Sequence, residues 1–227
     1  GASLALASLA SGQSTTTSNS DVDSPNLIEL SWSRYQPASL LAEFGAAQED
    51  FQVFERYLRG GGLPEIEQQL VGSLYDELAS YIVGDQIDEP VGRTFKGRHM
   101  ELLRKAHELL KDSDDFQGDF AATIQPEVEA LREEIRLAAV DASSIPMESL
   151  TPTLNGQQFW MEDVVFWGRL DGRITSGQYN RIVREALQLE QEETAAKVDE
   201  VLNNRERTSL HESAIKMNRE VISLVRK

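Results

Sequence analysis

Apolar side chains recur along much of this chain at alternating spacings of three and four residues, which is the repeat of one face of an α-helix. Leu, Ala, Glu and Gln are abundant while aromatic residues make up only 7% of the chain, and this composition also favours helices. The sequence therefore predicts an all-α fold. The first apolar seam consists of Leu40, Phe44, Ala47, Phe51, Phe54 and Leu58.

Glycine and proline mark where the first helices end and begin. Pro37 stands at the start of the first seam, and Gly60 to Gly62 end it, because three glycines make a helix costly and allow left-handed geometry. Pro64, with two glutamates close behind it, opens a second helix, since proline is tolerated in the first turn and carboxylates favour the positive end of the helix dipole. Gly84 and the acidic turn that follows close this helix.

The middle of the chain predicts two more helices and a linker. A basic helix is expected over 97–111, a loop over 112–125 and a fourth helix from Pro126. Residues 143–156 contain two prolines and no apolar period, so we place the main boundary there. The predicted organisation is an extended N-terminal arm (1–36), a helical body forming a bundle (37–142), a linker (143–156) and a C-terminal helical hairpin (157–227).

The last third predicts a helical hairpin followed by a coiled-coil-like seam. A helix over 157–169 is followed by a turn, and Thr175 with Gln178 forms the capping box of a long helix that runs to about Leu202. The final seam holds only about two heptads, which is too short for a stable isolated dimer. We expect it to pack on its own chain or on identical subunits. Its residues are Leu210, Ala214, Met217, Val221 and Leu224.

Charge is unevenly distributed along the chain. The net charge of −16 argues against nucleic-acid binding by the whole surface, so such contact is expected only through the basic segments 93–111 and 204–227. Residues 112–150, between them, are strongly acidic. Two interpretations stay open: the alternation pairs neighbouring helices or subunits, or it marks solvated helix faces.

No catalytic or metal-binding motif is present in the sequence. The absence of cysteine excludes disulfides and thiolate metal sites, and none of the three histidines has a second His or a carboxylate at helical spacing. Asp171-Gly172 resembles part of a calcium loop, but Trp167 and Arg169 occupy ligand positions, so it is expected to be a structural turn. Paired carboxylates such as Glu192-Glu193 are expected at the surface. We predict no cofactor, no metal and no enzymatic activity.

Candidate interaction residues are large apolar side chains in the arm, the hairpin and the last seam. Trp160 and Trp167 lie seven residues apart and therefore share a helix face. Core packing is the simplest role for them, and any exposed part of that face would anchor a protein partner. The candidates are Leu4, Leu6, Leu9, Trp32, Tyr35, Trp160, Trp167, Leu210, Met217, Val221 and Leu224.

The first twenty residues combine a small-residue apolar run, Gly1 to Gly12, with the Ser/Thr tract Gln13 to Ser20. This composition resembles the start of internal or ejected virion proteins of tailed bacteriophages. The resemblance implies a non-enzymatic structural protein, located in a phage particle, that packs with identical subunits and with other structural proteins of the assembly. We expect the arm to lie on a neighbouring subunit and the helical seams to dock in the oligomer.

Two other classes of function stay open. Ala2 to Ala10 is too short for the ~20 apolar residues of a membrane span, but it resembles the end of a signal-peptide apolar region. A secreted or periplasmic helical binding protein with an export remnant is therefore the alternative. An enzyme would require a pocket of converging polar groups, such as a buried carboxylate pair.

Overall fold

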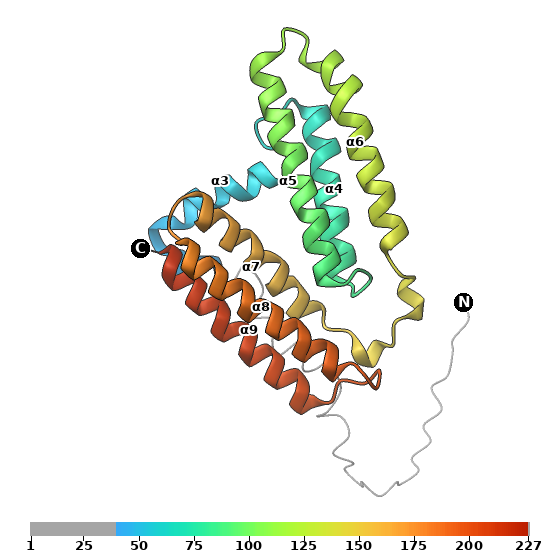
Figure 1. The fold of residues 1–227 in the computed structure, drawn as a ribbon, viewed down its shortest axis with the longest axis vertical. Coiled ribbons are helices and arrows are strands. Elements are labelled where there is room, and N and C mark those ends of the chain that lie inside the picture. Colours follow the sequence, from blue (N-terminus) through green and yellow to red (C-terminus); the bar gives the residue numbers. More distant parts are fainter. Residues whose placement is uncertain (1–39, 227) are drawn as a thin grey trace, which may run out of the picture.

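The computed structural model describes residues 40–226. This part of the chain contains seven α-helices and no strand, which confirms the all-α prediction (Figure 1). The predicted arm, with Leu4, Leu6, Leu9, Trp32 and Tyr35, lies outside the described residues. The elements are η3 (Leu41–Ala47), α3 (Gln48–Leu58), α4 (Glu65–Val83), α5 (Glu89–Asp112), α6 (Phe116–Ala138), η4 (Ala142–Ser144), η5 (Met147–Ser149), α7 (Pro152–Leu170), α8 (Ser176–Ala196) and α9 (Asn204–Val225).

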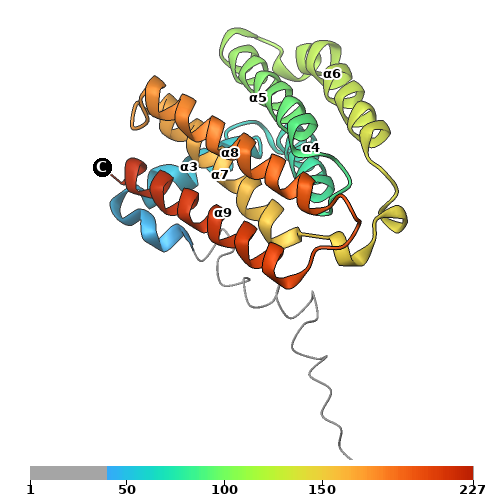
Figure 2. The same ribbon diagram turned by 60° about the horizontal axis from the view of Figure 1, so that its bottom comes forward.

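The helices form two groups that share α7. Helices α4, α5 and α6 pack together in one group, and α7, α8 and α9 form the other (Figures 1 and 2). Helix α7 packs against α9 within its own group and against α4 of the other group. Its side chains enter both cores, since Phe159 packs among the residues of α4, α5 and α6 while Trp160 and Val164 pack with α9. The two groups are therefore joined through one buried helix.

Most of the first apolar seam packs in the C-terminal group, whereas Leu58 at its end packs with α4, α5 and α6. Leu40, Phe44 and Phe51 are buried against Trp160 and Trp167, with ring centroids 5.3 Å apart for Phe51 and Trp167. The predicted division at 143–156 did not anticipate this packing, because aromatic side chains far apart in sequence cluster wherever the fold lets them lose the most apolar surface.

A kink at Gly45 divides the single helix predicted after Pro37. The glycine has φ +59° and ψ −129°, which side-chain-bearing residues rarely adopt, and the chain is 3₁₀ helix around it before α3 begins. The kink lets Phe44 and Phe51 stack with their ring centroids 5.1 Å apart.

Helices α5 and α6 both begin earlier than predicted. The loop expected over 112–125 is wrong from Phe116 onward, because Phe120 and Ile124 extend the apolar face of α6 and are buried. The Asp115 side chain caps this helix by accepting a hydrogen bond from the backbone N–H of Gly118. Pro126 lies inside α6, where it removes one backbone donor without ending the helix.

The oppositely charged segments 93–111 and 112–150 face each other across α5 and α6. Lys105 lies 2.7 Å from a carboxylate oxygen of Glu127, and Arg98 donates to both oxygens of Glu134. These pairs are exposed, so each contributes little to stability. Part of the charge alternation therefore pairs neighbouring helices of the same chain.

The connection between the two groups is fixed on one side by Arg207. Helix α7 begins at Pro152, so the linker ends at residue 151, five residues earlier than predicted, and the last residues of the predicted linker are helical. The fully buried Arg207 guanidinium donates to the carbonyl oxygens of Glu148, Leu150 and Leu202. The predicted capping box of Thr175 and Gln178 is confirmed. No helix within residues 40–226 has the length and apolarity needed to cross a membrane.

Candidate binding groove

A groove runs between α5 and α8, with α7 as its floor. Helices α5 and α8 are not close-packed neighbours, whereas α7 lies against α8 and against the helix that precedes α5. The space left between them is a cavity of about 250 Å³. Its apolar lining includes Met100 of α5, Met161 and Phe166 of α7, Ile182 and Val183 of α8, and Met217 of α9.

Three of the four methionines of the chain line this groove. Methionine is unbranched and polarizable, so a surface rich in it adapts to the shape of a partner. The fourth, Met147, is exposed in the connection between the two helical groups. The groove therefore combines an apolar wall with adaptable side chains, as binding sites for apolar groups do.

A buried lysine fixes the floor of the groove to α5. The ammonium of Lys96 lies 2.8 Å from Asp163 Oδ1, 3.3 Å from Glu162 Oε2 and 2.5 Å from the carbonyl oxygen of Phe159. Asp163 also accepts a hydrogen bond from the hydroxyl of Tyr75. Burial raises the pKa of Asp163, and the nearby Lys96 and the Tyr75 hydroxyl oppose that rise.

Arg93 continues this network across the groove to α8. Its Nε lies 2.7 Å from Glu162 Oε1 on α7, and its terminal nitrogen pairs with Glu190 on α8. One guanidinium thus joins side chains from three helices. Because guanidinium stays charged and presents several donors in a fixed geometry, it sets the spacing of α5 and α8.

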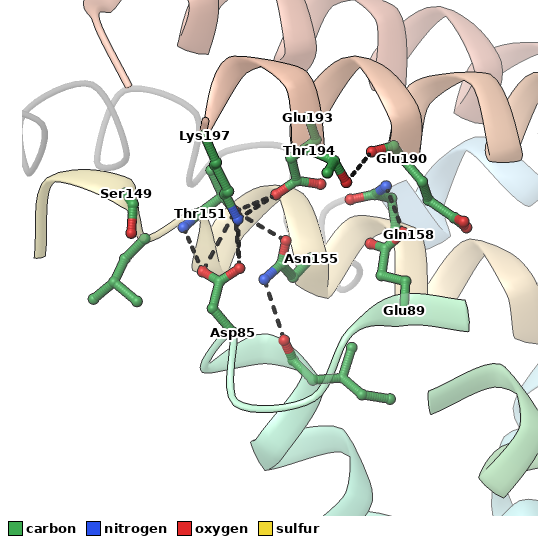
Figure 3. A network of polar contacts seen from close by, with 12 residues as sticks. Asp85, Glu89, Ser149, Thr151, Asn155, Gln158, Glu190, Glu193, Thr194 and Lys197 are labelled. Carbon is green, nitrogen blue, oxygen red and sulfur yellow. Dashed lines mark hydrogen bonds and ion pairs between the residues drawn. The ribbon is translucent and has the colours of Figure 1, made fainter. Parts of the chain in front are cut away.

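A carboxyl pair closes the polar end of the groove (Figure 3). The Glu89 side chain hydrogen-bonds to Glu190, and it accepts a 3.0 Å hydrogen bond from Gln158 Nε2. Burial, followed by the charges of Glu193, Glu190 and Glu162, holds the pKa of Glu89 well above its usual range. Because like charges so close do not both ionise readily, the neighbouring carboxyl group of Glu190 favours the protonated form of Glu89.

A second polar cluster lies beside the first, at the α4–α5 turn (Figure 3). The ammonium of Lys197 lies 2.5 Å from Asp85 Oδ1, 2.6 Å from Glu193 Oε1 and 2.8 Å from Thr151 Oγ1. Burial lowers the pKa of Lys197, but the Glu193 and Asp85 carboxylates outweigh it and raise that pKa overall. Asn155 donates from its side chain to the carbonyl oxygen of Ile82, at 3.1 Å. The cluster ties α4, α7 and α8 together at one end.

The predicted contact residues that the structure describes are buried within the chain itself. Trp160, Trp167, Val221 and Leu224 share one core with the first apolar seam, while Leu210 and Met217 pack with Leu154 and Leu189. The final seam thus packs on its own chain, against α7 and α8, which is one of the two alternatives for it. Of these residues, Met217 also lines the groove.

The groove itself could not be found by motif. Gln158 and Glu89 are 69 residues apart, and Arg93 and Glu190 are 97 residues apart. The expectation that Glu193 is a surface residue is wrong, because its side chain is buried beside Lys197. The one local signal for the Glu193–Lys197 pair was their spacing of four residues, which places opposite charges on one face of a helix.

Comparison with known proteins adds no relative: no family model, no curated protein and no solved structure matches this chain. No group of three or more His, Cys, Asp or Glu side chains within residues 40–226 is arranged to hold a metal ion.

Proposed function

We propose that this protein is a non-enzymatic structural protein that packs in a multi-subunit assembly and receives a partner segment in the groove between α5 and α8. The observation that carries the proposal is the groove itself: apolar side chains, three of them methionines, line a cavity of about 250 Å³. A partner side chain entering this space would bury apolar surface, which is the main favourable term in most protein association.

The polar ends of the groove support a preformed site. Arg93 and Lys96 hold α5 to α7, Arg93 also reaches α8, and Lys197 holds α8 to the α4–α5 turn. A site that is already in its binding shape loses less conformational entropy when the partner arrives. The same pairs keep the groove open, because they space the helices without filling the gap between them.

The resemblance of residues 1–20 to virion proteins supports placing this assembly in a phage particle. In that proposal the partners are identical subunits and other structural proteins, and residues 1–36 reach a neighbouring subunit. The contribution of the arm and that of the groove are each tested by a separate variant.

The first test removes residues 1–36 and, separately, fills the groove with Gly97→Leu. Gly97 lines the groove, and a Cβ atom added there meets no other atom within 4 Å. We expect both variants to keep the circular dichroism of a helical protein and to lose self-association in sedimentation velocity. Assembly that is unchanged in both variants would overturn the proposal.

The matched control is Gly177→Leu. Gly177 is an exposed glycine near the start of α8, and a Cβ atom there also meets no other atom within 4 Å. Gly177→Leu gives α8 the helix propensity that Gly97→Leu gives α5, but it leaves the groove unfilled. Its self-association is expected to equal that of the unmodified chain.

One observation favours an enzyme as a second candidate. Glu89 and Glu190 are hydrogen-bonded carboxyl groups in a groove, and the pKa of Glu89 is raised, as in sites that separate an acid from a base. An enzyme of this kind would hydrolyse one of a panel of chromogenic glycosides or esters, and Glu89→Gln would abolish that hydrolysis. Turnover that survives both Glu89→Gln and Glu190→Gln would exclude this pair as its source.

A further inference from the structure

Glu89 differs from the other carboxyl groups at the polar end of the groove. Glu162, Asp163, Glu190, Glu193 and Asp85 each lie within ion-pair distance of Arg93, Lys96 or Lys197. Glu89 has no such cation among residues 40–226 and meets only Gln158 and Glu190 as hydrogen-bond partners. Six carboxyl groups thus face three cations, and Glu89 is the one without a cation.

Two acceptor atoms at this end of the groove have no hydrogen-bond partner. Glu89 Oε1 and Gln158 Oε1 are both buried and unpaired, and the Gln158 side chain is only 7% exposed. Both residues line the cavity. A buried acceptor left without a donor has lost its hydrogen bonds to water without replacement, so this pair of atoms is suited to a donor brought by a ligand.

We propose that the polar end of the groove binds the cationic side chain of a protein partner, a lysine ammonium or an arginine guanidinium, between Glu89 and Gln158. The proposal rests on the proposed function, since it names the chemistry of the segment that the groove receives. The methylene stem of such a side chain would lie on the apolar wall that includes Met100 and Met161.

The chemistry of the site favours a cation over other ligands. An anion would meet the carboxyl groups of Glu89, Glu190 and Glu162, while the donors of Arg93 and Lys96 are already engaged with carboxylates. A neutral amide could satisfy Gln158 but would bring no positive charge to favour the ionised form of Glu89. A cation on an apolar stem would donate hydrogen bonds to both acceptor atoms, and its stem would pack against the apolar wall of the groove.

This chain itself holds one candidate for that side chain. Arg34 is the sole Lys or Arg among residues 1–55, and Trp32 and Tyr35 stand on either side of it in the sequence. A neighbouring copy could therefore supply a guanidinium together with two aromatic rings. A lysine or arginine of another protein in the assembly has the same chemistry, and the test below separates the two sources.

The experiment titrates the full chain with three blocked amino acids and follows binding by NMR. The probes are N-acetyl-lysine methylamide, N-acetyl-arginine methylamide and the uncharged N-acetyl-norleucine methylamide, which keeps the lysine stem without its ammonium. We expect a charged probe to bind about tenfold or more tightly than the norleucine probe, as a charge-assisted hydrogen bond in a buried site requires. Equal binding of all three probes would overturn the proposal.

Two variants and a control assign the binding to these residues. Glu89→Gln is nearly isosteric, and Gln158→Met removes the second acceptor. Each is expected to weaken the charged probes about tenfold and to leave the norleucine probe unchanged. Glu192→Gln is the control, because Glu192 is an exposed carboxylate of α8 that bonds to Gln188 outside the groove. If the charged probes bind the Glu89→Gln and Gln158→Met variants with the same affinity as the unmodified chain, the assignment of the site to these two residues is wrong.

Arg34→Ala distinguishes the two sources of the cation. If a neighbouring copy supplies Arg34, this variant loses self-association and binds the charged probes more tightly than the unmodified chain does. If another protein supplies the cation, self-association and probe binding stay unchanged while Glu89→Gln still loses the probes. Loss of assembly without any probe binding would support the proposed function and refute this inference, so the two fail separately.

Discussion

At the scale of single residues, buried polar side chains decide how the helices fit together. His99 in α5 is fully buried, with Nε2 2.8 Å from the carbonyl oxygen of Leu58 and its ring 5.4 Å from that of Tyr75. Burial lowers the pKa of His99 to about 4, so the ring is neutral in the folded protein and donates to Leu58. Protonation would place a charge in this buried position, so the neutral ring is the form that favours the packing of α5 on α3.

The stability of the protein is therefore expected to fall as the pH falls from about 6.5 towards 4. In that window the unfolded chain takes up a proton on His99 and the folded chain does not, so protons favour unfolding, by up to about 3 kcal/mol. His99→Gln keeps a neutral donor and should lose this dependence. Urea unfolding of both proteins at pH 7 and pH 4.5 measures it, and a parallel fall in both would contradict the assignment.

At the scale of the elements, the kink at Gly45 turns one predicted helix into two. Its backbone angles are strained for any residue with a side chain, although a Cβ there would meet nothing within 4 Å. Strain of this kind costs about 1–3 kcal/mol. The kink is what brings Phe44 and Phe51 together onto Trp160 and Trp167.

Gly45→Ala is expected to lower the free energy of unfolding by about 1–3 kcal/mol through backbone strain alone. Gly177→Ala is the control, because Gly177 is an α8 glycine whose φ lies outside the left-handed region, and there alanine should add up to about 1 kcal/mol. Chemical denaturation of the two variants compares these effects. An equal change in both would show that Gly45 is not strained.

At the scale of the whole molecule, we expect α7 to make the two helical groups unfold together. It contributes to both cores, and its Asp163 is joined to Lys96 of α5, where both side chains are nearly inaccessible. A buried pair that loses one partner leaves an uncompensated charge, whereas an exposed pair is worth little.

We expect Lys96→Met to destabilise the protein by about 3–5 kcal/mol, and we expect Arg104→Met, which breaks only exposed pairs with Glu101 and Glu108, to leave its stability almost unchanged. In a Trp32→Phe background, Trp160 and Trp167 report the C-terminal core while circular dichroism reports all helices. The two signals should change at the same urea concentration. Separate transitions would show that α7 does not couple the groups.

The sequence by itself determined what depends on near neighbours. Apolar spacing located the helices, and the capping box of Thr175 and Gln178 located the start of α8, because both are set within a few turns of one helix. The same local reasoning placed a loop over 112–125, where tertiary packing of Phe120 and Ile124 extends α6 instead. The fold class was therefore predictable, whereas this helix boundary was not.

Only the tertiary structure decided which helix faces pack against one another and that a groove is left between α5 and α8. The groove brings Glu89, Gln158 and Glu190 together from three helices. The first apolar seam packs against Trp160 and Trp167, which lie far from it in the sequence. The physical reason is that burial and ion pairing depend on distance in space, and a helical period fixes which side chains share a face but not which helix that face will meet.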